Sequence, residues 1–272
     1  SVAQYRASIT MLLVDNAVEV MRHSEAVNYD LTSLGTTSVC SFVKKLGSAF
    51  REDWRALTGS TMVEAAYGMT ETNTCDTFTV GLQANDYDLQ QQPVFVGLPV
   101  PETDIIIRDF ETGALKALGE TGEICIRSPS ILKSYWNKPD ETDHAIRDGW
   151  LHTGDIGMVN ERGFVHYLGR RKEMLKVNGM PVFPAEIEML LGRHPAVLGS
   201  GVIGRSDPNK GEVPVAFVHL DPDQADGLDA DALRAWCREN MASFKVPEIR
   251  LVEGLPMTAT GKVKKEKLAA LL

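Results

Sequence analysis

Residues 67–71 (YGMTE) place a glycine next to a hydroxyl and a carboxylate within one short segment. Glycine lets a loop approach a phosphate group closely, and a carboxylate oxygen is a ligand that Mg²⁺ and similar hard cations prefer. A turn in which Thr70 or Thr72 caps a helix would use the same residue types. The segment by itself therefore leaves two interpretations open, a loop that binds phosphate with a cation and a capped turn.

Residues 149–155 (GWLHTGD) end in a carboxylate, Asp155, that follows a glycine at the expected start of a strand. A carboxylate in such a place can accept two hydrogen bonds from the hydroxyls of a sugar, as acidic residues do in dinucleotide sites. An ordinary Gly-Asp turn explains the same residues, and it is the preferred interpretation if the segment is taken alone.

Two stretches concentrate positive charge in a chain whose net charge is −9. Arginine can clamp phosphate or ribose oxygens, and lysine is a mobile point charge that suits a phosphate. The alternative is two solvated basic stretches, the second of them in a frayed terminus. The first stretch comprises Arg170, Arg171, Lys172 and Lys176, and the second comprises Lys262, Lys264, Lys265 and Lys267.

The elements that must position these residues change in character along the chain. Apolar residues at mainly helical spacing predict a helix over residues 10–22, and the pattern returns over residues 38–57, which suggests part of an α/β layer. From residue 95 to 168, short strand-like runs alternate with turn signals and predict a compact, barrel-like β-subdomain. The predicted strands are residues 103–108, 122–127, 155–159 and 163–168.

The pattern changes again after Gly169. A helix is predicted from Pro184, with proline in its first turn and acidic residues near its start. Strands over residues 202–203 and 213–220 and a helix over residues 229–242 follow. This order suits a small independent α+β domain, whose boundary is expected at residues 169–172.

Composition excludes several classes of protein. The chain has 272 residues, which fits one large or two modest domains, and its acidic surface disfavours nucleic acid as a partner. No apolar run is long enough to span a bilayer. The four cysteines are widely spaced without a metal-binding pattern, which favours reduced thiols in a cytoplasmic protein.

Taken together and in order, these segments resemble the ANL superfamily of AMP-forming adenylating enzymes. The resemblance rests on YGMTET, GEICIRS, DGWLHTGD, GRRKEMLKVNGMPVFPAEIE and PMTATGKVKKEKL, and it covers essentially the whole chain. Residues 30–39 also resemble a family segment but carry Thr36 and Thr37 where the family has Gly and Ala. The fold class that this implies is α/β and α+β. Residues 1–169 would form the C-terminal part of the large AMP-binding domain, with its β-barrel-like subdomain, and residues 170–272 the lid domain.

The resemblance implies an ATP-dependent acyl-CoA synthetase. Such an enzyme adenylates a carboxylic acid, here a fatty or other hydrophobic one, and transfers the acyl group to CoA, with ATP/AMP and Mg²⁺ as cofactors. An adenylation domain that loads a carrier protein and a non-catalytic descendant of the family remain as alternatives. No histidine stands in a nucleophile–base arrangement, and His152 is expected to be structural or to line a pocket.

The resemblance also assigns roles to single residues of the first segments. Tyr67 would lie against adenine, with Gly68 beside it in the nucleotide site. Thr70 would contact phosphate oxygens, and Glu71 would help to hold Mg²⁺. Asp155 would accept hydrogen bonds from both ribose hydroxyls.

The resemblance also implies roles for four residues of the basic stretches and for Gly179. Arg170 would contact ribose or phosphate, and Lys262 would bridge the carboxylate and the α-phosphate. Lys172 occupies the family's hinge position, about which the lid rotates between the half-reactions. Lys176 and Gly179 would face the adenylate and line the CoA tunnel, where a side chain at Gly179 would obstruct a thin passage.

One family element is missing from the 272 residues. The Ser/Thr/Gly-rich phosphate loop with its lysine is absent, because the nearest candidate, Ser33–Ser38, has no lysine at the required place. We therefore expect the chain to be a piece of a longer protein, with the N-terminal half of that protein as its partner, and to be inactive alone. The acid and the oligomeric state cannot be read from these residues.

Overall fold

The computed structural model describes residues 1–91 and 94–272, which divide into two units. The first unit comprises Ser1–Leu12, Met21–Cys40 and Ser48–Lys172. The second unit comprises Leu13–Val20, Ser41–Gly47 and Glu173–Leu272. Because the second unit includes two short N-terminal segments, the division into residues 1–169 and 170–272 stays a prediction.

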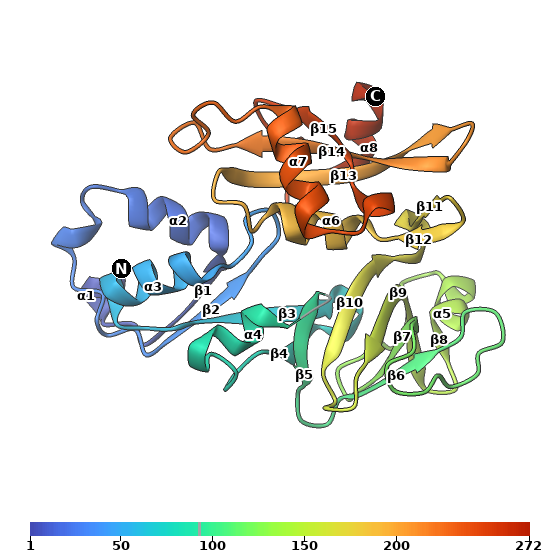
Figure 1. The fold of residues 1–272 in the computed structure, drawn as a ribbon. Coiled ribbons are helices and arrows are strands. Elements are labelled where there is room, and N and C mark those ends of the chain that lie inside the picture. The colour runs from blue at the N-terminus through green and yellow to red at the C-terminus, as the bar shows by residue number, and fades with distance from the viewer. Residues whose placement is uncertain (92–93) are drawn as a thin grey trace. The chain divides into compact units, whose positions relative to one another are not determined.

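The N-terminal region alternates helices and strands (Figure 1). The helix predicted over residues 10–22 begins only at Val14, because Ile9–Leu13 form a strand. In the predicted segment 38–57, a strand ends at Cys40 and the helix begins at Ser48. The elements are α1 (Val2–Tyr5), β1 (Ile9–Leu13), α2 (Val14–Arg22), β2 (Thr36–Cys40), α3 (Ser48–Thr58) and β3 (Met62–Met69).

The middle of the chain is rich in strands, as its turn signals predict. The predicted strands over residues 103–108 and 122–127 are present as β6 and β7. The strand predicted over residues 155–159 is the second half of the longer strand β9, and the one predicted over residues 163–168 is shifted by two residues to β10. The elements are β4 (Thr74–Phe78), α4 (Tyr87–Gln90), β5 (Phe95–Pro99), β6 (Asp104–Arg108), β7 (Gly122–Arg127), α5 (Pro139–Ala145), β8 (Ile146–Arg147), β9 (Trp150–Val159) and β10 (Val165–Arg170).

These strands form one continuous mixed sheet in the order β1-β2-β3-β4-β5-β10-β9-β7-β6, with β8 paired to β9. Strands β2 and β3 are parallel. Every later neighbouring pair in this order, from β3-β4 to β7-β6, is antiparallel. The mixed α/β class is thus confirmed. Among the described residues β6 stays an edge strand, so the subdomain predicted to be barrel-like is an open sheet and not a closed barrel.

The chain after Glu173 builds a second sheet, in the order β12-β11-β14-β13, with β15 parallel to β14. Asp229 caps the second predicted helix, because its Oδ1 accepts a hydrogen bond of 2.8 Å from the Ala232 N–H. The elements are β11 (Leu175–Val177), β12 (Met180–Val182), α6 (Pro184–Leu191), β13 (Val197–Asp207), β14 (Gly211–Leu220), α7 (Ala230–Asn240), β15 (Glu248–Leu251) and α8 (Lys265–Leu268).

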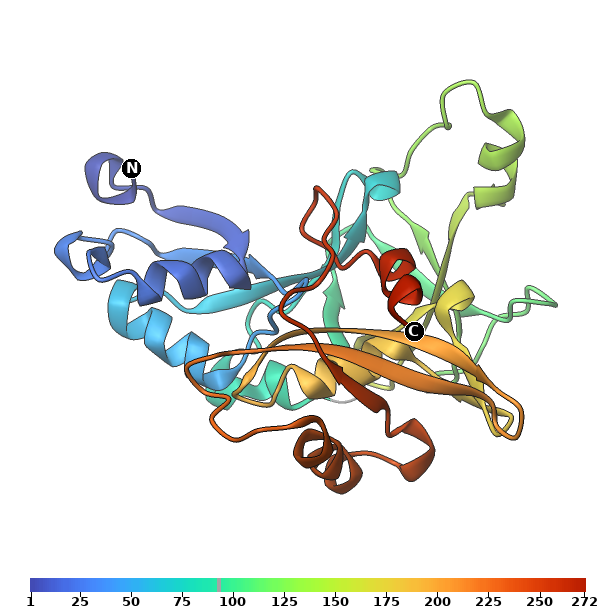
Figure 2. The same ribbon diagram turned by 90° about the horizontal axis from the view of Figure 1, so that it is seen from above.

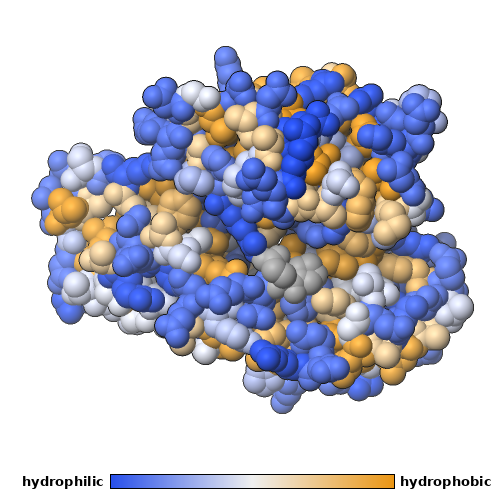
Figure 3. All heavy atoms as spheres, viewed as in Figure 1, coloured by the Kyte–Doolittle hydropathy of each residue, from blue (hydrophilic) through white to orange (hydrophobic). Residues whose placement is uncertain are grey.

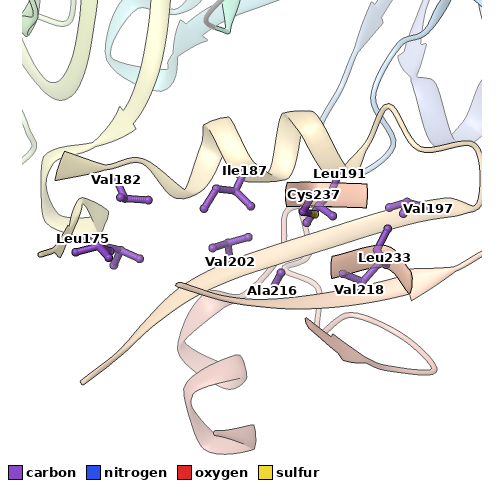
Figure 4. Close-up of a cluster of buried hydrophobic side chains, with 11 residues drawn as sticks. Leu175, Val182, Ile187, Leu191, Val197, Val202, Ala216, Val218, Leu233 and Cys237 are labelled. Carbon is purple, nitrogen blue, oxygen red and sulfur yellow. The ribbon is translucent and has the colours of Figure 1, made fainter. Parts of the chain in front are cut away.

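The two faces of this second sheet bury different helices. Alternation along β14 sends Ala216 and Val218 to the face covered by α6 and α7, where Ile187 and Leu233 are buried (Figure 4). Val215 and Phe217 point to the opposite face. There they pack against Leu268 of α8, which lies across the sheet from α7 (Figure 2). The second unit therefore has a hydrophobic core of its own on each face of its sheet.

The visible surface is mainly hydrophilic, with scattered apolar areas (Figure 3). Within residues 1–91 and 94–272, no helix is long and apolar enough to cross a membrane.

Candidate functional site

Strands β9 and β10 place Asp155 and Arg170 directly opposite each other. The two residues are cross-strand partners, and Arg170 Nε lies 2.8 Å from Asp155 Oδ1. The Arg170 guanidinium also donates to the Thr153 carbonyl at 3.2 Å. Two glycines in conformations that disfavour a side chain precede the pair, Gly154 with φ +70° and Gly169 with φ +144°. Any other residue would be strained at these two positions, so each glycine suits the backbone conformation that leads into Asp155 or Arg170.

Tyr67 of β3 completes the surroundings of Asp155. Its hydroxyl donates a hydrogen bond of 2.7 Å to Asp155 Oδ2, and its ring centroid lies 5.7 Å from that of Tyr167. Burial and the neighbouring Asp155 charge raise the pKa of Tyr67 well above its ordinary value. The phenol therefore stays protonated and remains a donor. With 2% of its surface exposed, Asp155 is a buried carboxylate inside a strand, which a surface Gly-Asp turn does not describe.

Glu123 of β7 holds the backbone that leads to Asp155. Its Oε1 accepts a hydrogen bond of 3.0 Å from the Gly154 N–H, and its Oε2 lies 2.8 Å from His152 Nδ1. Glu123, Cys125 and His152 each offer one potential metal-ligand atom, and these three atoms lie within 4.8 Å of one another. Both Glu123 oxygens have hydrogen-bonding neighbours in Gly154 and His152, so the group supports β9 from the neighbouring strand β7.

Glu71 lies in the short 3₁₀ helix Thr70–Thr72 directly after β3. Its Oε1 accepts a hydrogen bond of 2.9 Å from the Tyr135 hydroxyl, and its carbonyl accepts the Leu132 N–H at 2.6 Å. The loop from 128 to 138 therefore holds both the backbone and the carboxylate of Glu71. Gly68 and Thr70 are exposed beside it.

Lys262 lies on the returning side of a tight loop in the second unit. The Thr258 N–H donates to the Lys262 carbonyl at 2.7 Å, and the Lys264 N–H donates to the Pro256 carbonyl at 2.7 Å. The side chain of Lys262 is exposed, and its Nζ lies 5.0 Å from the ring centroid of Phe42, which belongs to the same unit. The loop thus presents an ammonium group on a well-bonded backbone.

Lys176 and Gly179 belong to the hairpin between β11 and β12. Val177 pairs with Met180, and the two residues between them, Asn178 and Gly179, have φ of +52° and +77°. A two-residue turn of this kind favours Asn-Gly. The positive φ of Gly179 is therefore what the turn requires of this position, and its place beside a CoA tunnel stays a prediction.

The predicted residues thus fall into separate groups. Tyr67, Asp155 and Arg170 form one bonded cluster in the first unit. Glu71 follows Tyr67 by four residues, and its side chain accepts a hydrogen bond from Tyr135. Lys176, Gly179 and Lys262 belong to the second unit, and Lys172 is an exposed residue at the end of the first. Sequence reasoning assigned no role to Glu123 or Tyr135. Glu123 lies in the GEICIRS segment that carries the resemblance, and Tyr135 lies in residues 133–137 (KSYWN), so only these places in the sequence could have drawn attention to them.

Comparison with known proteins identifies the class. The AMP-binding enzyme model matches residues 1–136, and the AMP-binding enzyme C-terminal domain model matches residues 186–262. The chain therefore belongs to the AMP-binding enzyme family, within the ANL superfamily of adenylating enzymes. The predicted resemblance is confirmed.

Several individual proteins are similar to this chain. A long-chain-fatty-acid–CoA ligase of Yersinia pestis is 38% identical over 221 residues, which cover 81% of this chain and 37% of that ligase. The anthranilate CoA ligase AuaEII, solved with anthranoyl-AMP, is 30% identical with a TM-score of 0.82, over 99% of this chain and 51% of its own. The amide bond synthetase McbA from Marinactinospora thermotolerans is 27% identical with a TM-score of 0.85, over 100% of this chain and 54% of its own. The chain thus spans about half, or less, of the length of these relatives.

Proposed function

We propose that the longer protein that carries this chain is an ATP-dependent, AMP-forming acyl-CoA synthetase. The observation that carries the proposal is the buried Asp155 carboxylate, held by Tyr67 on one oxygen and by Arg170 on the other. A fixed acceptor beside a cation is chemically suited to ribose hydroxyls and a nearby phosphate. CoA ligases among the relatives support the reaction class.

In the proposed site, Asp155 accepts hydrogen bonds from the two ribose hydroxyls, and Arg170 contacts ribose or phosphate oxygens. Tyr67 contributes its buried ring to the adenine side, with Gly68 beside it. Because Asp155 already pairs with Tyr67 and Arg170, the nucleotide would enter a prearranged group of polar atoms, which lowers the cost of ordering the site.

Glu71 fits a magnesium ion in this proposal. One of its oxygens accepts the Tyr135 hydroxyl, which orients the carboxylate without neutralising it. Magnesium in nucleotide sites is commonly held by one or two carboxylates together with substrate phosphates. When bound, the ion would offset phosphate charge, and the exposed Thr70 hydroxyl would bind a phosphate oxygen beside it.

The second unit would supply the mobile part of the site. Lys262 would stabilise the charge that develops as the carboxylate attacks the α-phosphate, since the attacking carboxylate needs no general base. Lys172 would be the hinge between the half-reactions. Lys176 and Gly179 would face the adenylate and line the path of CoA.

We further propose a fatty or other hydrophobic acid as the substrate, supported by the long-chain-fatty-acid–CoA ligase of Yersinia pestis. The anthranilate ligase shows that the family also includes an enzyme named for an aromatic acid. The substrate panel of the test must therefore contain both acid types.

The test uses the full-length protein and measures pyrophosphate release across a panel of carboxylic acids, with and without CoA. Lys262→Ala should lower adenylation on the order of 100-fold or more, because it removes a charge that acts in the transition state. Asp155→Asn should raise the KM for ATP about 10- to 100-fold, as expected for a lost charge-assisted hydrogen bond.

Two matched variants serve as controls. Lys264→Ala removes an exposed lysine of the same tail, and Asp104→Asn alters an exposed aspartate of the same sheet. Both should leave the kinetics within about twofold of the unchanged enzyme, as surface substitutions usually do. Absence of pyrophosphate release with every acid would contradict the proposal and favour a non-catalytic module.

A different acceptor is the second candidate. The similarity to an amide bond synthetase favours an amine as a possible acceptor, and a carrier-protein thiol is the other alternative. Adenylation without CoA-dependent product, but with product from an amine or a carrier, would assign the protein to one of these classes.

A further inference from the structure

Lys265 forms a partly buried ion cluster in the second unit. Its Nζ lies 2.8 Å from Glu173 Oε2 and 2.9 Å from Glu188 Oε1, with 24% of the side chain exposed. Burial by itself lowers the pKa of Lys265, but attraction from Glu188 and Glu173 outweighs it, and the pKa is raised. The ammonium group therefore stays charged and holds two carboxylates together.

The three residues come from distant parts of the chain. Glu173 directly follows Lys172, and Glu188 lies on α6, where its Oε1 also accepts the Val202 N–H of β13 at 2.8 Å. Lys265 begins α8, three residues after Lys262. The cluster thus ties the tail of the chain to the start of the second unit's long C-terminal segment and to its core helix.

The helix that Lys265 begins, α8, is also held by an apolar contact with the sheet. Leu268 is fully buried against β14, and a Cβ added at Gly201 of β13 would come within 2.6 Å of Leu268 Cδ1 and 2.9 Å of Val263 Cγ1. The tail therefore lies directly on the backbone of the sheet. Sliding along it would break both this contact and the Lys265 ion pairs.

The connection from Lys265 to Lys262 is short and internally bonded. The Lys262 N–H donates to Thr258 Oγ1 at 3.1 Å, in addition to the two backbone hydrogen bonds that close the loop. A displacement of Lys265 would therefore be transmitted to the backbone of Lys262 and would not be absorbed by a flexible linker.

We propose that Lys265 is a positioning residue for adenylation. It anchors the Lys262 loop to Glu173 and Glu188, so that Lys262 moves as a rigid part of the second unit. This inference rests on the proposed function, in which Lys262 acts in the first half-reaction, as the carboxylate attacks the α-phosphate. Losing the anchor should therefore impair one half-reaction selectively.

The test measures the two half-reactions separately in the full-length protein. Lys265→Met should slow adenylate formation on the order of 10- to 100-fold, as misplacement by about 1 Å can do. Acyl-CoA formation from supplied acyl-adenylate should stay within about twofold. Lys265→Arg should restore most of the adenylation rate, and combining Lys265→Met with Lys262→Ala should add little to the loss from Lys262→Ala alone.

Lys267→Met is the matched control, because Lys267 is an exposed lysine of the same helix. It should change neither half-reaction. If Lys265→Met fails to fold, Glu173→Gln replaces it, since that variant removes one partner and leaves Glu188 in place, and the same selective loss is expected.

Unchanged adenylation in a folded Lys265→Met variant would overturn the inference. Equal loss of both half-reactions would also overturn it, because that result indicates a general structural role. If the unsubstituted protein forms no adenylate, the proposed function fails instead, which keeps the two failures distinct.

Discussion

Asp76 of β4 is an ionisable side chain with no exposed surface. Thr72 Oγ1 donates to its Oδ2 at 2.7 Å, whereas its Oδ1 has no hydrogen-bond partner among residues 1–91 and 94–272. Burial raises the pKa of Asp76 to about 6, although the Thr72 hydrogen bond acts in the opposite direction. The folded state therefore binds this proton more tightly than the unfolded state does.

The pH dependence follows from that sign. Asp76 favours folding most below its ordinary pKa of 3.8, and this contribution is lost as the pH rises to about 6. Asp76→Asn should remove the loss and make the protein more stable at pH 7.5, by at most about 3 kcal/mol for a shift of about two pKa units. Urea unfolding of both proteins at pH 4.5, 5.5 and 7.5 checks this. A stability difference that does not grow with pH would count against it.

Residue types alone left the site open, since an ordinary Gly-Asp turn was the preferred interpretation of residues 149–155. The resemblance to the ANL superfamily selected Tyr67, Asp155 and Arg170, but it did not indicate the residues that support them. Glu123 and Tyr135 act by contacting Gly154 and Glu71 across the fold. No local pattern encodes such partners, since strand pairing and loop docking create them.

Helix α3 is joined to the segment before β5 by a buried ion cluster. Arg51 is 1% exposed and bonds both oxygens of Asp88, at 2.8 and 2.6 Å, and Asp86 at 2.6 Å. A bidentate arginine of this kind fixes direction as well as distance. The cluster therefore holds the region of α4 against α3.

Removing the arginine should be costly because it leaves two carboxylates without their cation. Arg51→Met should lower the free energy of unfolding by about 3–5 kcal/mol. Arg55→Met, on the exposed side of the same helix, should stay within about 0.5 kcal/mol. Denaturant unfolding of the two variants gives the comparison. Similar losses of unfolding free energy from both would show that the buried cluster contributes no more to stability than an exposed arginine does.

Elements with strong local signals were predictable, and those shaped by tertiary contacts were not. The helix after Pro184 and the helix after Asp229 begin within a residue of prediction, because a first-turn proline and a capping aspartate mark them. Residues 10–13 share the apolar spacing of α2, yet sheet pairing makes them part of β1. The missing barrel closure has a similar origin, since short strands do not reveal which edges pair.

At the scale of the whole molecule, the 272-residue chain represents only part of the length of its relatives. No Ser/Thr/Gly-rich phosphate loop with its lysine occurs in its sequence. We expect the purified chain to form no acyl-adenylate from ATP and a carboxylic acid, whereas the full-length protein should form it. Mass spectrometry of the reaction mixture distinguishes the two results, and robust adenylate from the chain alone would refute the expectation.

The pairing of Asp155 with Arg170 has a thermodynamic consequence. Arg170 ends β10 and stands two residues before the proposed hinge at Lys172. A nucleotide that engages Asp155 and Arg170 would therefore restrain the strand from which the hinge emerges. Linkage then requires reciprocity: if one lid orientation binds nucleotide more tightly, nucleotide favours that orientation by the same factor. In the proposed function, affinity for AMP would thus report the equilibrium between lid orientations, and a substitution at the proposed hinge would change that affinity without touching the ligand.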